Sequence, residues 1–453
     1  MFDPTPGQLR LFKLFDLLLD ANGPDTLLIK GYAGTGKTSI VSSLVKVLTL
    51  FNFKSMLLAP TGRAAKVLSV YSGRKAFTIH KIIYKLSLDE SGELKFKRVK
   101  NYNKNTVFMI DEASMIYDNA SFGSASLLKD LTDYIFEHPS NKMIIIGDTA
   151  QLPPVGHLYS GALDKNNLEF KYKLNVESIE LTDVVRQQKE SGILHNATLL
   201  RINIKEELNH IYLKTNTFGD TFRMSSLKME DGLRYSYDKY GIEDTIIICQ
   251  SNKQTIMYNQ MIRRSLLFYD NEIDTGDYLM IVKNNYFWLE EDSPTGFLAN
   301  GDFAEILKIS NFEERYGYKF ADLSLRLVDY EDHPKVYAKA ILNTLYSPSP
   351  SLSMEESRVL YDEIANQYEG IPKKEFKKAM AEDPYLNALQ IKFTYAITCH
   401  KSQGGQWSSV FIDQGYIKDE ILDSGYLRWL YTGITRATKE LFLVNFHDDF
   451  FLR

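Results

Sequence analysis

One segment of the sequence has the residue types and spacing of a phosphate-binding loop. Residues 31–38 match the pattern G-x-x-x-x-G-K-[ST], between an expected strand at 26–31 and an expected helix at 37–50. In such a loop, glycines let backbone N–H groups surround phosphates, and the helix N-terminus adds its positive dipole end. Lys37 is expected to neutralise the β- and γ-phosphate oxygens, and Thr38 to ligate Mg²⁺. The nucleotide-binding residues predicted here are Gly31, Tyr32, Ala33, Gly34, Thr35, Gly36, Lys37, Thr38 and Ser39.

Two adjacent carboxylates, Asp111 and Glu112, follow the apolar run at 106–110. At the end of a strand they fit a Walker B pair, in which Asp111 holds Mg²⁺ through water and Glu112 polarises the attacking water. An isolated Asp-Glu pair at this place is usually a solvated strand exit. This pair lies about 75 residues after the phosphate-binding loop, which favours the catalytic interpretation.

Three further segments place polar groups where phosphates could bind. Gln151 lies in GDTAQLPP (147–154) and could sense the γ-phosphate, while the two prolines stiffen its loop. Residues 59–66 and 78–81 each put hydroxyls and cations at the start of a helix, which suits backbone phosphates. Taken singly, these last two segments are more often ordinary helix caps and solvated helix faces.

The elements that must position these residues alternate between strand and helix at both ends of the chain. This alternation is typical of parallel sheets built from βαβ units. Between the two ends, residues 277–330 have an antiparallel pattern, and 354–383 are charged and helical with Pro372 as a break. The other expected strands are 55–60, 106–112, 142–148, 244–250, 392–398, 408–413 and 440–445, with helices at 61–70 and near 252–266.

Composition limits the class of protein. A chain of 453 residues suits about three domains. It has no apolar run near the ~20 residues of a membrane helix, and its N-terminus lacks a secretory pattern. Cys249 and Cys399 are the only cysteines and both lie in apolar runs, which argues against a disulfide scaffold or zinc site and suits the cytoplasm. The net charge of −5 disfavours a protein that coats nucleic acid but allows a local basic groove.

Together with three downstream segments, these motifs resemble those of superfamily 1 helicases. The downstream segments are LTDVVRQ (181–187), AITCHKSQG (396–404) and YTGITRA (431–437). The HKSQG and GDxxQLPPVG forms are similar to the RecD/Dda-like branch. The resemblance spans residues 8–446 and is weakest across 190–240 and 330–390. It implies an α/β fold with two RecA-like lobes, use of ATP and Mg²⁺, and 5′-to-3′ movement on single-stranded DNA.

The resemblance also implies roles for residues at the cleft between the lobes. Arg186 and Arg436 match arginine fingers, which stabilise charge in the phosphoryl-transfer transition state. Gln8 resembles the adenine-reading glutamine of the family, although a plain helix-start glutamine fits nearly as well. Gly404 is included among the nucleotide-binding residues. The predicted catalytic set is Lys37, Asp111, Glu112, Gln151, Arg186 and Arg436.

The strand in such helicases lies across both lobes. The positions that match its contacts are Pro60, Thr61, Arg63, His80, Lys81, Asn252, Lys253, Thr398, His400 and Lys401. Residues 86–104 suggest a β-hairpin, and in the family a hairpin here parts the duplex. Phe96 is then the candidate stacking residue; the alternative is a short loop with a core-facing phenylalanine.

The resemblance divides the chain into three parts. We expect a first lobe at 1–175, a second lobe at 176–270 and 390–453, and an SH3-like domain with a helical arm at 271–389. Gly301 is expected at a hairpin turn. The arm, 354–383, resembles an extra arm of Dda-like enzymes; the alternative is that it only braces the barrel.

The expected partners are single-stranded DNA and duplex junctions, without a membrane. We expect a monomer that meets replication or recombination proteins. Two alternatives stay open: a motor subunit of a RecD-like exonuclease complex, and an RNA-directed NTPase or ATP-controlled strand-binding switch. Strand displacement on tailed duplexes distinguishes them.

Overall fold

The computed structural model describes residues 4–88, 94–118, 126–154, 156–157, 159–183, 190–208, 210–289, 297–328, 330, 335–415 and 423–451. Of residues 38, 86–88 and 94–96 only the backbone is described. Arg186 therefore lies outside the described residues, as do the side chains of Thr38 and Phe96. No described helix has the length and apolar character needed to cross a membrane.

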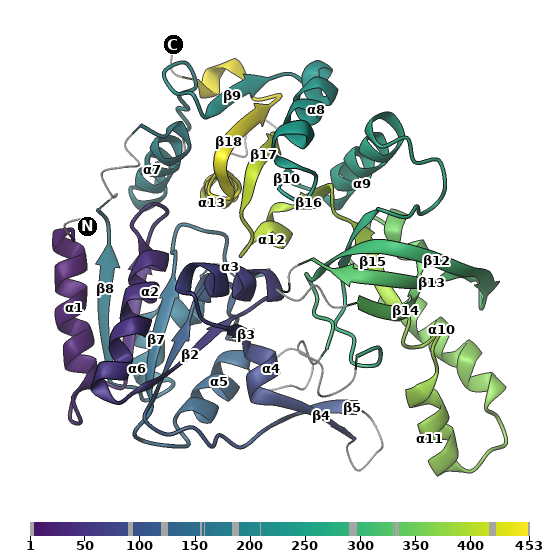
Figure 1. Cartoon of the computed structure of the whole chain (residues 1–453), viewed down its shortest axis with the longest axis horizontal. Helices are drawn as coiled ribbons and strands as arrows, with labels where there is room; N and C mark the ends of the chain where they lie inside the picture. The colour runs from purple at the N-terminus through teal and green to yellow at the C-terminus, as the bar shows by residue number, and fades with distance from the viewer. Residues whose placement is uncertain are drawn as a thin grey trace.

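A six-stranded parallel sheet forms the centre of the first lobe (Figure 1). Its strand order is β3 (Ala76–Thr78), β2 (Lys54–Ala59), β6 (Thr106–Ile110), β7 (Lys142–Gly147), β1 (Thr26–Gly31) and β8 (Val176–Leu181). The central strands β6, β7 and β1 are buried along almost their whole length and are mostly apolar, because helices cover both faces of the sheet. The helices of this lobe are α1 (Pro6–Leu19), α2 (Lys37–Leu48), α3 (Gly62–Ser72), α4 (Ile79–Ile83), α5 (Leu127–Ile135) and α6 (Lys165–Phe170).

The first sheet brings three motifs to one edge. The phosphate-binding loop follows β1, the Asp111–Glu112 pair follows β6, and Asp148 follows β7. These strands are parallel, with β7 paired to both β6 and β1. Their carboxyl ends therefore meet, and this edge is where parallel α/β sheets bind ligands.

A second parallel sheet has the order β16 (Ala396–Thr398), β10 (Thr245–Cys249), β17 (Trp407–Asp413), β18 (Ala437–Val444) and β9 (Thr221–Met224). Its helices are α7 (Gly192–Lys205), α8 (Met229–Tyr240), α9 (Asn252–Met261), α12 (Cys399–Ser402) and α13 (Ser424–Ile434), with a π-helical turn at Ile262–Leu266. The two-lobed parallel architecture predicted from the sequence is confirmed.

Between α9 and β16 the chain forms a closed barrel of β11 (Tyr278–Ile281), β12 (Phe303–Arg315), β13 (Tyr318–Leu327), β14 (Lys335–Ile341) and β15 (Leu389–Phe393). The Gly301 turn precedes β12 and has a φ of 100°, which glycine adopts readily. The arm consists of α10 (Met354–Gln367) and α11 (Lys373–Glu382), with Pro372 as the N-cap of α11. It packs on the barrel through a separate apolar cluster that includes Leu360, Ile364, Met380, Phe320 and Ile341.

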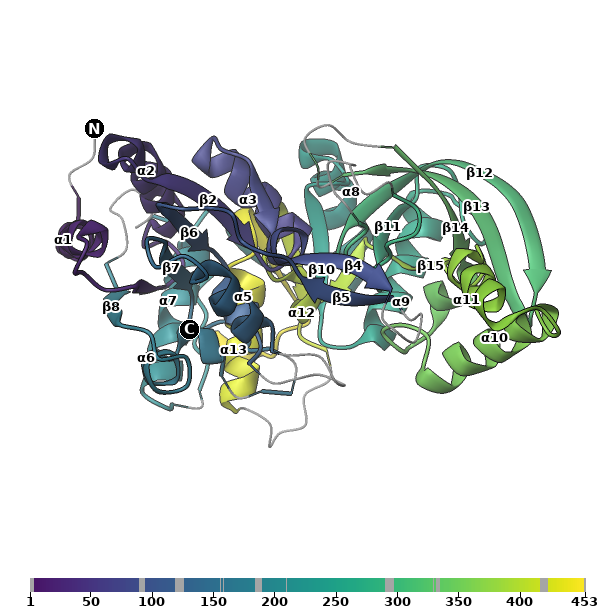
Figure 2. The same ribbon diagram turned by 90° about the horizontal axis from the view of Figure 1, so that it is seen from below.

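The expected hairpin is formed by β4 (Tyr84–Leu88) and β5 (Leu94–Arg98), which pair antiparallel with Leu86 opposite Phe96. Its base is fixed to the first lobe on both strands. The Tyr84 hydroxyl donates to Asp130 Oδ2 at 2.6 Å, and Arg98 Nη1 donates to Glu137 Oε1 at 2.7 Å. Figures 1 and 2, which are views at right angles to each other, both show the hairpin extending from the first lobe toward the arm.

Two boundaries differ from the sequence prediction. β8 pairs with β1, so the first sheet extends to Leu181, past the boundary expected at residue 175. The single strand expected at 392–398 is two strands in two domains: β15 closes the barrel and β16 pairs with β10 in the second sheet. The first difference arises because β8 is a partly exposed edge strand, and the second because the chain crosses from the barrel to the second lobe within one continuous buried run.

Candidate nucleotide cleft and strand groove

The phosphate-binding loop is folded for close approach by an anion. Gly34 and Gly36 have φ angles of 78° and 80°, which favour glycine. A β-carbon on Gly31 would lie 3.0 Å from the Lys37 side chain, so this position must also stay small. The Lys37 ammonium donates to the carbonyl oxygens of Gly31 at 2.6 Å and Tyr32 at 3.0 Å, and lies 3.9 Å from Asp148 Oδ2. The cation is thus held directly over the loop.

The two carboxylates lie at the end of β6, beside that loop. The Glu112 N–H donates to Asp111 Oδ1 at 2.9 Å, and Glu112 has a left-handed φ of 52° that turns the chain sharply. Burial, followed by the charge of Glu112, raises the pKa of Asp111. A positive ion near this pair would offset both effects.

Arg436 reaches this pair from the second lobe. Its side chain is 4% exposed, and its Nη1 lies 3.8 Å from Glu112 Oε1. Its Nε donates to the Thr432 carbonyl at 3.1 Å, and Nη1 donates to the Gly405 carbonyl at 3.2 Å. These bonds orient the guanidinium toward the first lobe.

Tyr431, which lies in α13 of the second lobe, contacts two motifs of the first lobe. Its hydroxyl donates to Asp148 Oδ2 at 2.6 Å and accepts from the Ala33 N–H at 3.0 Å. Burial and the Asp148 charge raise the pKa of Tyr431. The phosphate-binding loop and the loop after β7 are therefore both bound to the same residue of the second lobe.

The loop after β7 connects the cleft to a second site. The Leu152 N–H donates to Thr432 Oγ1 at 2.8 Å, and its carbonyl accepts from Gln403 Nε2 at 2.7 Å. Gln403 follows α12, which carries His400 and Lys401. Two residues beyond Leu152, Pro154 lines a large groove. The backbone of Leu152 is thus shared between the cleft and this groove.

Two contacts at the cleft have no sequence signal. The Arg201 guanidinium from α7 lies 4.3 Å from the centre of the Tyr32 ring, and the Tyr32 hydroxyl donates to Glu180. Burial and Glu180 raise the pKa of Tyr32 to about 12. Neither Arg201 nor Glu180 belongs to a recognisable motif. Glu180 lies on β8, beside β1 in the first sheet, whereas Arg201 reaches Tyr32 only because the two lobes approach each other.

A groove of about 1270 Å³ lies between the lobes and the barrel. Its lining includes basic residues from every part of the molecule: Arg63 and His80 from the first lobe, His400 and Lys401 from the second, Lys283 from the barrel, Arg358 from the arm, and also His157. Burial lowers the pKa of His80 and His400, so the arginines and lysines supply the positive charge. Among the described residues that line it, none is an aspartate or glutamate. This absence contrasts with the net charge of −5 of the whole chain.

Comparisons with known proteins agree with this geometry. The family described as "AAA domain" matches residues 19–216, and "UvrD-like helicase C-terminal domain" matches 393–444. Protein R530 of Acanthamoeba polyphaga mimivirus is 26% identical, covering 96% of this chain and 98% of its own length. The ATP-dependent DNA helicase dda of Enterobacteria phage T4 is 25% identical, covering 98% of this chain and 99% of its own length.

A crystal structure of Bacteroides Pif1 bound to ssDNA covers 100% of this chain and 95% of its own, with 16% identity and a TM-score of 0.50. This likeness concerns the fold. The chain belongs to the Pif1/RecD/Dda-like helicases of superfamily 1. The resemblance seen in the motifs is confirmed.

The helicase brings most of the predicted strand contacts into one groove. Pro60, Thr61, Arg63, His80, His400 and Lys401 all line it. The Arg63 guanidinium also packs against both the Phe303 and the Trp407 ring, at 4.5 and 4.2 Å from their centres. Lys401 Nζ donates to Asn300 Oδ1 of the barrel at 2.5 Å, and burial lowers the pKa of Lys401 to about 8.

Four predicted strand contacts lie outside the groove lining. Thr398 caps α12 and Lys253 lies in α9, but neither lines the groove. Lys81 Nζ lies 5.8 Å from the centre of the Phe77 ring, and Asn252 Nδ2 donates to the Pro348 carbonyl at 3.0 Å. These four stay predictions from the family pattern.

The remaining nucleotide-site residues have mixed positions. Gln8 forms a capping box with Thr5, which supports the helix-start interpretation, yet its Nε2 donates to the Thr35 carbonyl at 3.4 Å. Ser39 is exposed in the first turn of α2.

A β-carbon on Gly404 would lie 2.8 Å from Ala64 Cβ, so Gly404 packs against α3. Gln151 is buried, and its Oε1 has no partner among the described residues.

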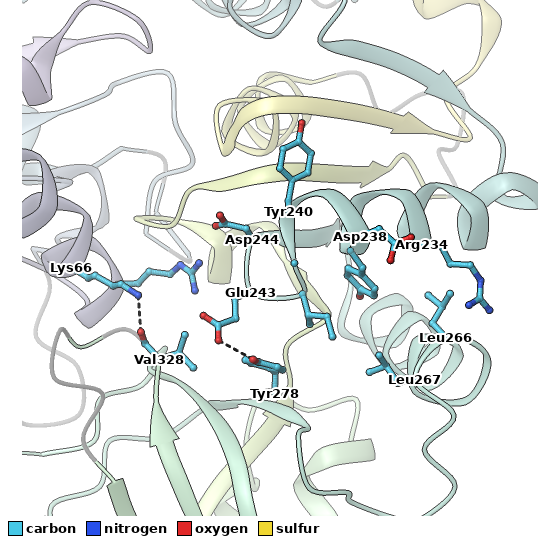
Figure 3. Close-up of a pocket in the computed structure, with 14 residues that line it drawn as sticks. Lys66, Arg234, Asp238, Tyr240, Glu243, Asp244, Leu266, Leu267, Tyr278 and Val328 are labelled. Atoms are coloured by element: carbon cyan, nitrogen blue, oxygen red, sulfur yellow. Dashed lines mark hydrogen bonds between the residues drawn. The ribbon is translucent and has the colours of Figure 1, made fainter.

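A second cavity of about 820 Å³ lies where α3, α8 and the barrel meet (Figure 3). There Lys66 Nζ donates to the Val328 carbonyl at 2.7 Å, and the Tyr278 hydroxyl donates to Glu243 Oε1 at 2.9 Å. Three carboxylates line it: Asp238, Glu243 and Asp244. The two hydrogen bonds connect the lobes to the barrel at this cavity. Because of its three carboxylates, the cavity suits a polyanion less than the groove does.

Proposed function

We propose that this helicase hydrolyses ATP in the cleft between its lobes and uses the cycle to move 5′ to 3′ along single-stranded DNA, separating duplex ahead of it. The observation that carries the proposal is the groove of about 1270 Å³, which is lined by cations from both lobes, the barrel and the arm, without a described carboxylate. A phosphate backbone is the ligand that such a lining favours.

Hydrolysis would follow from the residues at the cleft. Lys37 would leave the loop carbonyls for the β- and γ-phosphates, and Glu112 would accept a proton from the attacking water. Asp111 would hold Mg²⁺, and its raised pKa supports this because a cation would favour the ionised form. A bound Mg²⁺ would neutralise charge on the β- and γ-phosphate oxygens. Arg436 would stabilise the transition state from the second lobe, as an arginine finger does.

Movement would follow from the loop after β7. At the start of this loop, Asp148 lies 3.9 Å from Lys37. Further along it, the Leu152 carbonyl accepts a hydrogen bond from Gln403, and Pro154 lines the groove. A change at the γ-phosphate would therefore displace the segment that positions His400 and Lys401. Alternating grip by the two lobes on the backbone tolerates any sequence because it depends on phosphate contacts.

The test is strand displacement on duplexes with either a 5′ or a 3′ single-stranded tail, with ATP turnover measured in parallel. We expect opening of the 5′-tailed duplex only, and ATPase stimulated by single-stranded DNA. The Dda-like resemblance, which covers 98% of this chain, supports this direction. Opening of the 3′-tailed duplex alone would contradict the direction and leave the helicase activity intact.

RNA provides the necessary comparison, because the groove contacts expected here are to phosphates that RNA shares. Single-stranded RNA of the same length is added to the same ATPase assay. Equal stimulation by RNA, with no DNA displacement, would favour the alternative of an RNA-directed NTPase. Stimulation without displacement of any duplex would favour a strand-binding switch.

A further inference from the structure

The arm has a face that the proposed movement does not use. A third cavity, of about 870 Å³, lies between α11 and the segment after β11. This volume is within the range of about 300–1,000 Å³ typical of sites for small organic molecules. Its lining includes Lys374, Lys377 and Lys378 of α11, together with Lys283 and Phe287 from the segment after β11.

This cavity continues the strand groove. Lys283, Asn284 and Tyr286 line both, so a chain leaving the groove past these residues reaches α11 directly. In Figures 1 and 2 the β4–β5 hairpin extends toward this same arm. The cavity is therefore on the side of the molecule where strand separation is proposed.

The lining has the two properties that a nucleotide needs. Its described residues include four lysines and two carboxylates, Glu375 and Glu382, with Glu382 lying 3.9 Å from Lys378. Its apolar part includes Leu386, Ala381, Ala388 and Phe287, which is 36% exposed. A positive rim around an apolar, aromatic surface is typical of single-strand binding sites.

The arm is also rigid enough to hold such a site. Met380 of α11 and Leu360 of α10 are buried against Phe320 and Ile341 of the barrel. The Tyr368 hydroxyl donates to Asp383 Oδ2 at 3.0 Å, which joins the end of α10 to the end of α11. The lysines therefore project from a supported helix.

We propose that the arm carries a second subsite for single-stranded DNA, in which one base stacks on Phe287 while the adjacent phosphates contact Lys374, Lys377 and Lys378. This inference rests on the proposed function, because it extends the strand path beyond the groove. It assigns the arm a role in holding DNA, in addition to bracing the barrel.

The first test replaces Lys374, Lys377 and Lys378 together by alanine in the full chain. Affinity is measured by fluorescence anisotropy for oligothymidines of about 8 and about 16 nucleotides, within the usual range of strand sites. We expect about tenfold weaker binding of the longer one, unchanged binding of the shorter one, and a salt slope lower by about 2, at about 0.7 per phosphate contact. Arginine at the same three positions should restore the affinity.

The matched control replaces Lys13, Lys46 and Lys54 by alanine, because these three are exposed and line neither cavity. It makes the same change in net charge and should leave both affinities unaltered. An equal loss in the control would overturn the proposal, since the effect would then come from net charge.

The second test concerns the base. Phe287→Ala should weaken binding of the longer oligothymidine on the order of tenfold, and Phe287→Trp should preserve it, since stacking on aromatic rings accounts for a loss of this size. An abasic site is then moved along the oligonucleotide. At the one position whose base stacks on Phe287, the abasic site should weaken DNA binding by the wild type. The same abasic site should not weaken binding by Phe287→Ala any further, because that variant has already lost the stacking contact.

The outcomes separate this proposal from the proposed function. If single-stranded DNA fails to stimulate the wild-type ATPase, the proposed function is wrong. If the wild type is stimulated but the lysine variant binds the longer oligonucleotide with wild-type affinity and salt slope, the arm does not contact DNA and the inference is wrong.

Discussion

Arg436 Nη1 of the second lobe lies 3.8 Å from Glu112 Oε1 of the first lobe, although 324 positions separate the two residues in the sequence. The two charges belong to different sheets, so their approach depends on closure of the cleft. We infer that the carboxylate proposed to activate water and the cation proposed to stabilise the transition state are brought together by the same movement.

Removal of either charged group at the γ-phosphate should stop turnover. We expect Lys37→Ala and Glu112→Gln to reduce ATP hydrolysis below a tenth of wild type, measured as phosphate release. Glu112→Gln should still bind ATP, because Lys37 and the loop N–H groups remain. A fluorescent ATP analogue measures that affinity; residual turnover above a tenth would refute the assignment of the mutated residue.

Arg436→Ala should lower turnover by about 10³-fold, the size expected for an arginine finger. Arg436 also donates hydrogen bonds to the carbonyl oxygens of Thr432 and Gly405, so its removal could disrupt the local fold as well as the chemistry. Thermal unfolding is therefore measured beside ATPase, and Arg436→Lys serves as the conservative variant. Lysine keeps the charge but lacks the planar fork, so we expect only partial recovery. Loss of DNA affinity with normal basal ATPase would place Arg436 at the strand.

Gln403→Ala should uncouple the groove from the cleft. Its Nε2 is the donor to the Leu152 carbonyl, and leaving a buried carbonyl unpaired costs about 1–3 kcal/mol. We expect basal ATPase to persist and its stimulation by single-stranded DNA to fall. Steady-state ATPase with and without oligothymidine measures both quantities. An unchanged stimulation ratio would show that the loop after β7 does not transmit the signal.

DNA affinity should depend on pH through Lys401, whose pKa burial lowers to about 8. Below pH 8 the ammonium is charged and attracts phosphate; above it the charge is lost, so affinity should fall as the pH rises through 8 to 9. Lys401→Arg should remove most of the pH dependence of DNA affinity, whereas Lys46→Arg, at an exposed position of α2, should not. Equal pH profiles for all three proteins would contradict this role.

The local motifs were predictable because their chemistry lies in consecutive residues. The phosphate-binding loop, the Asp111–Glu112 pair and the β4–β5 hairpin need only short-range order, and the structure contains each of them where the sequence indicated. Pro372 marked the break between α10 and α11 because proline cannot continue the preceding helix.

Contacts between the lobes were not predictable by the same reasoning. The bond between Gln403 and Leu152 spans 251 positions, and the bond between Lys401 and Asn300 spans 101. Each depends on how whole domains pack, which no local pattern records. β8 was assigned to the wrong lobe for a related reason: it is a partly exposed edge strand, so its apolar pattern did not link it to the buried β1.

The last prediction separates movement from unwinding. The groups proposed to act on ATP are Lys37, Asp111, Glu112, Gln151 and Arg436, with Arg186 predicted from the sequence, and the β4–β5 hairpin supplies none of them. Its strands are joined to the lobe through Tyr84 and Arg98. We expect it to act as a fixed wedge that keeps separated bases apart.

The size of the effect can be anticipated from stacking. A base-pair step contributes about 1.4 kcal/mol of stacking, and a base stacked on an aromatic side chain gains about 1–3 kcal/mol. Phe96→Ala, or replacement of residues 89–100 by a short Gly-Ser turn, should therefore greatly slow strand displacement. ATPase stimulated by single-stranded DNA should continue, as should displacement of streptavidin from a single strand. Normal unwinding by these variants would exclude the wedge, and loss of ATPase would show instead that the hairpin supports the fold of the first lobe.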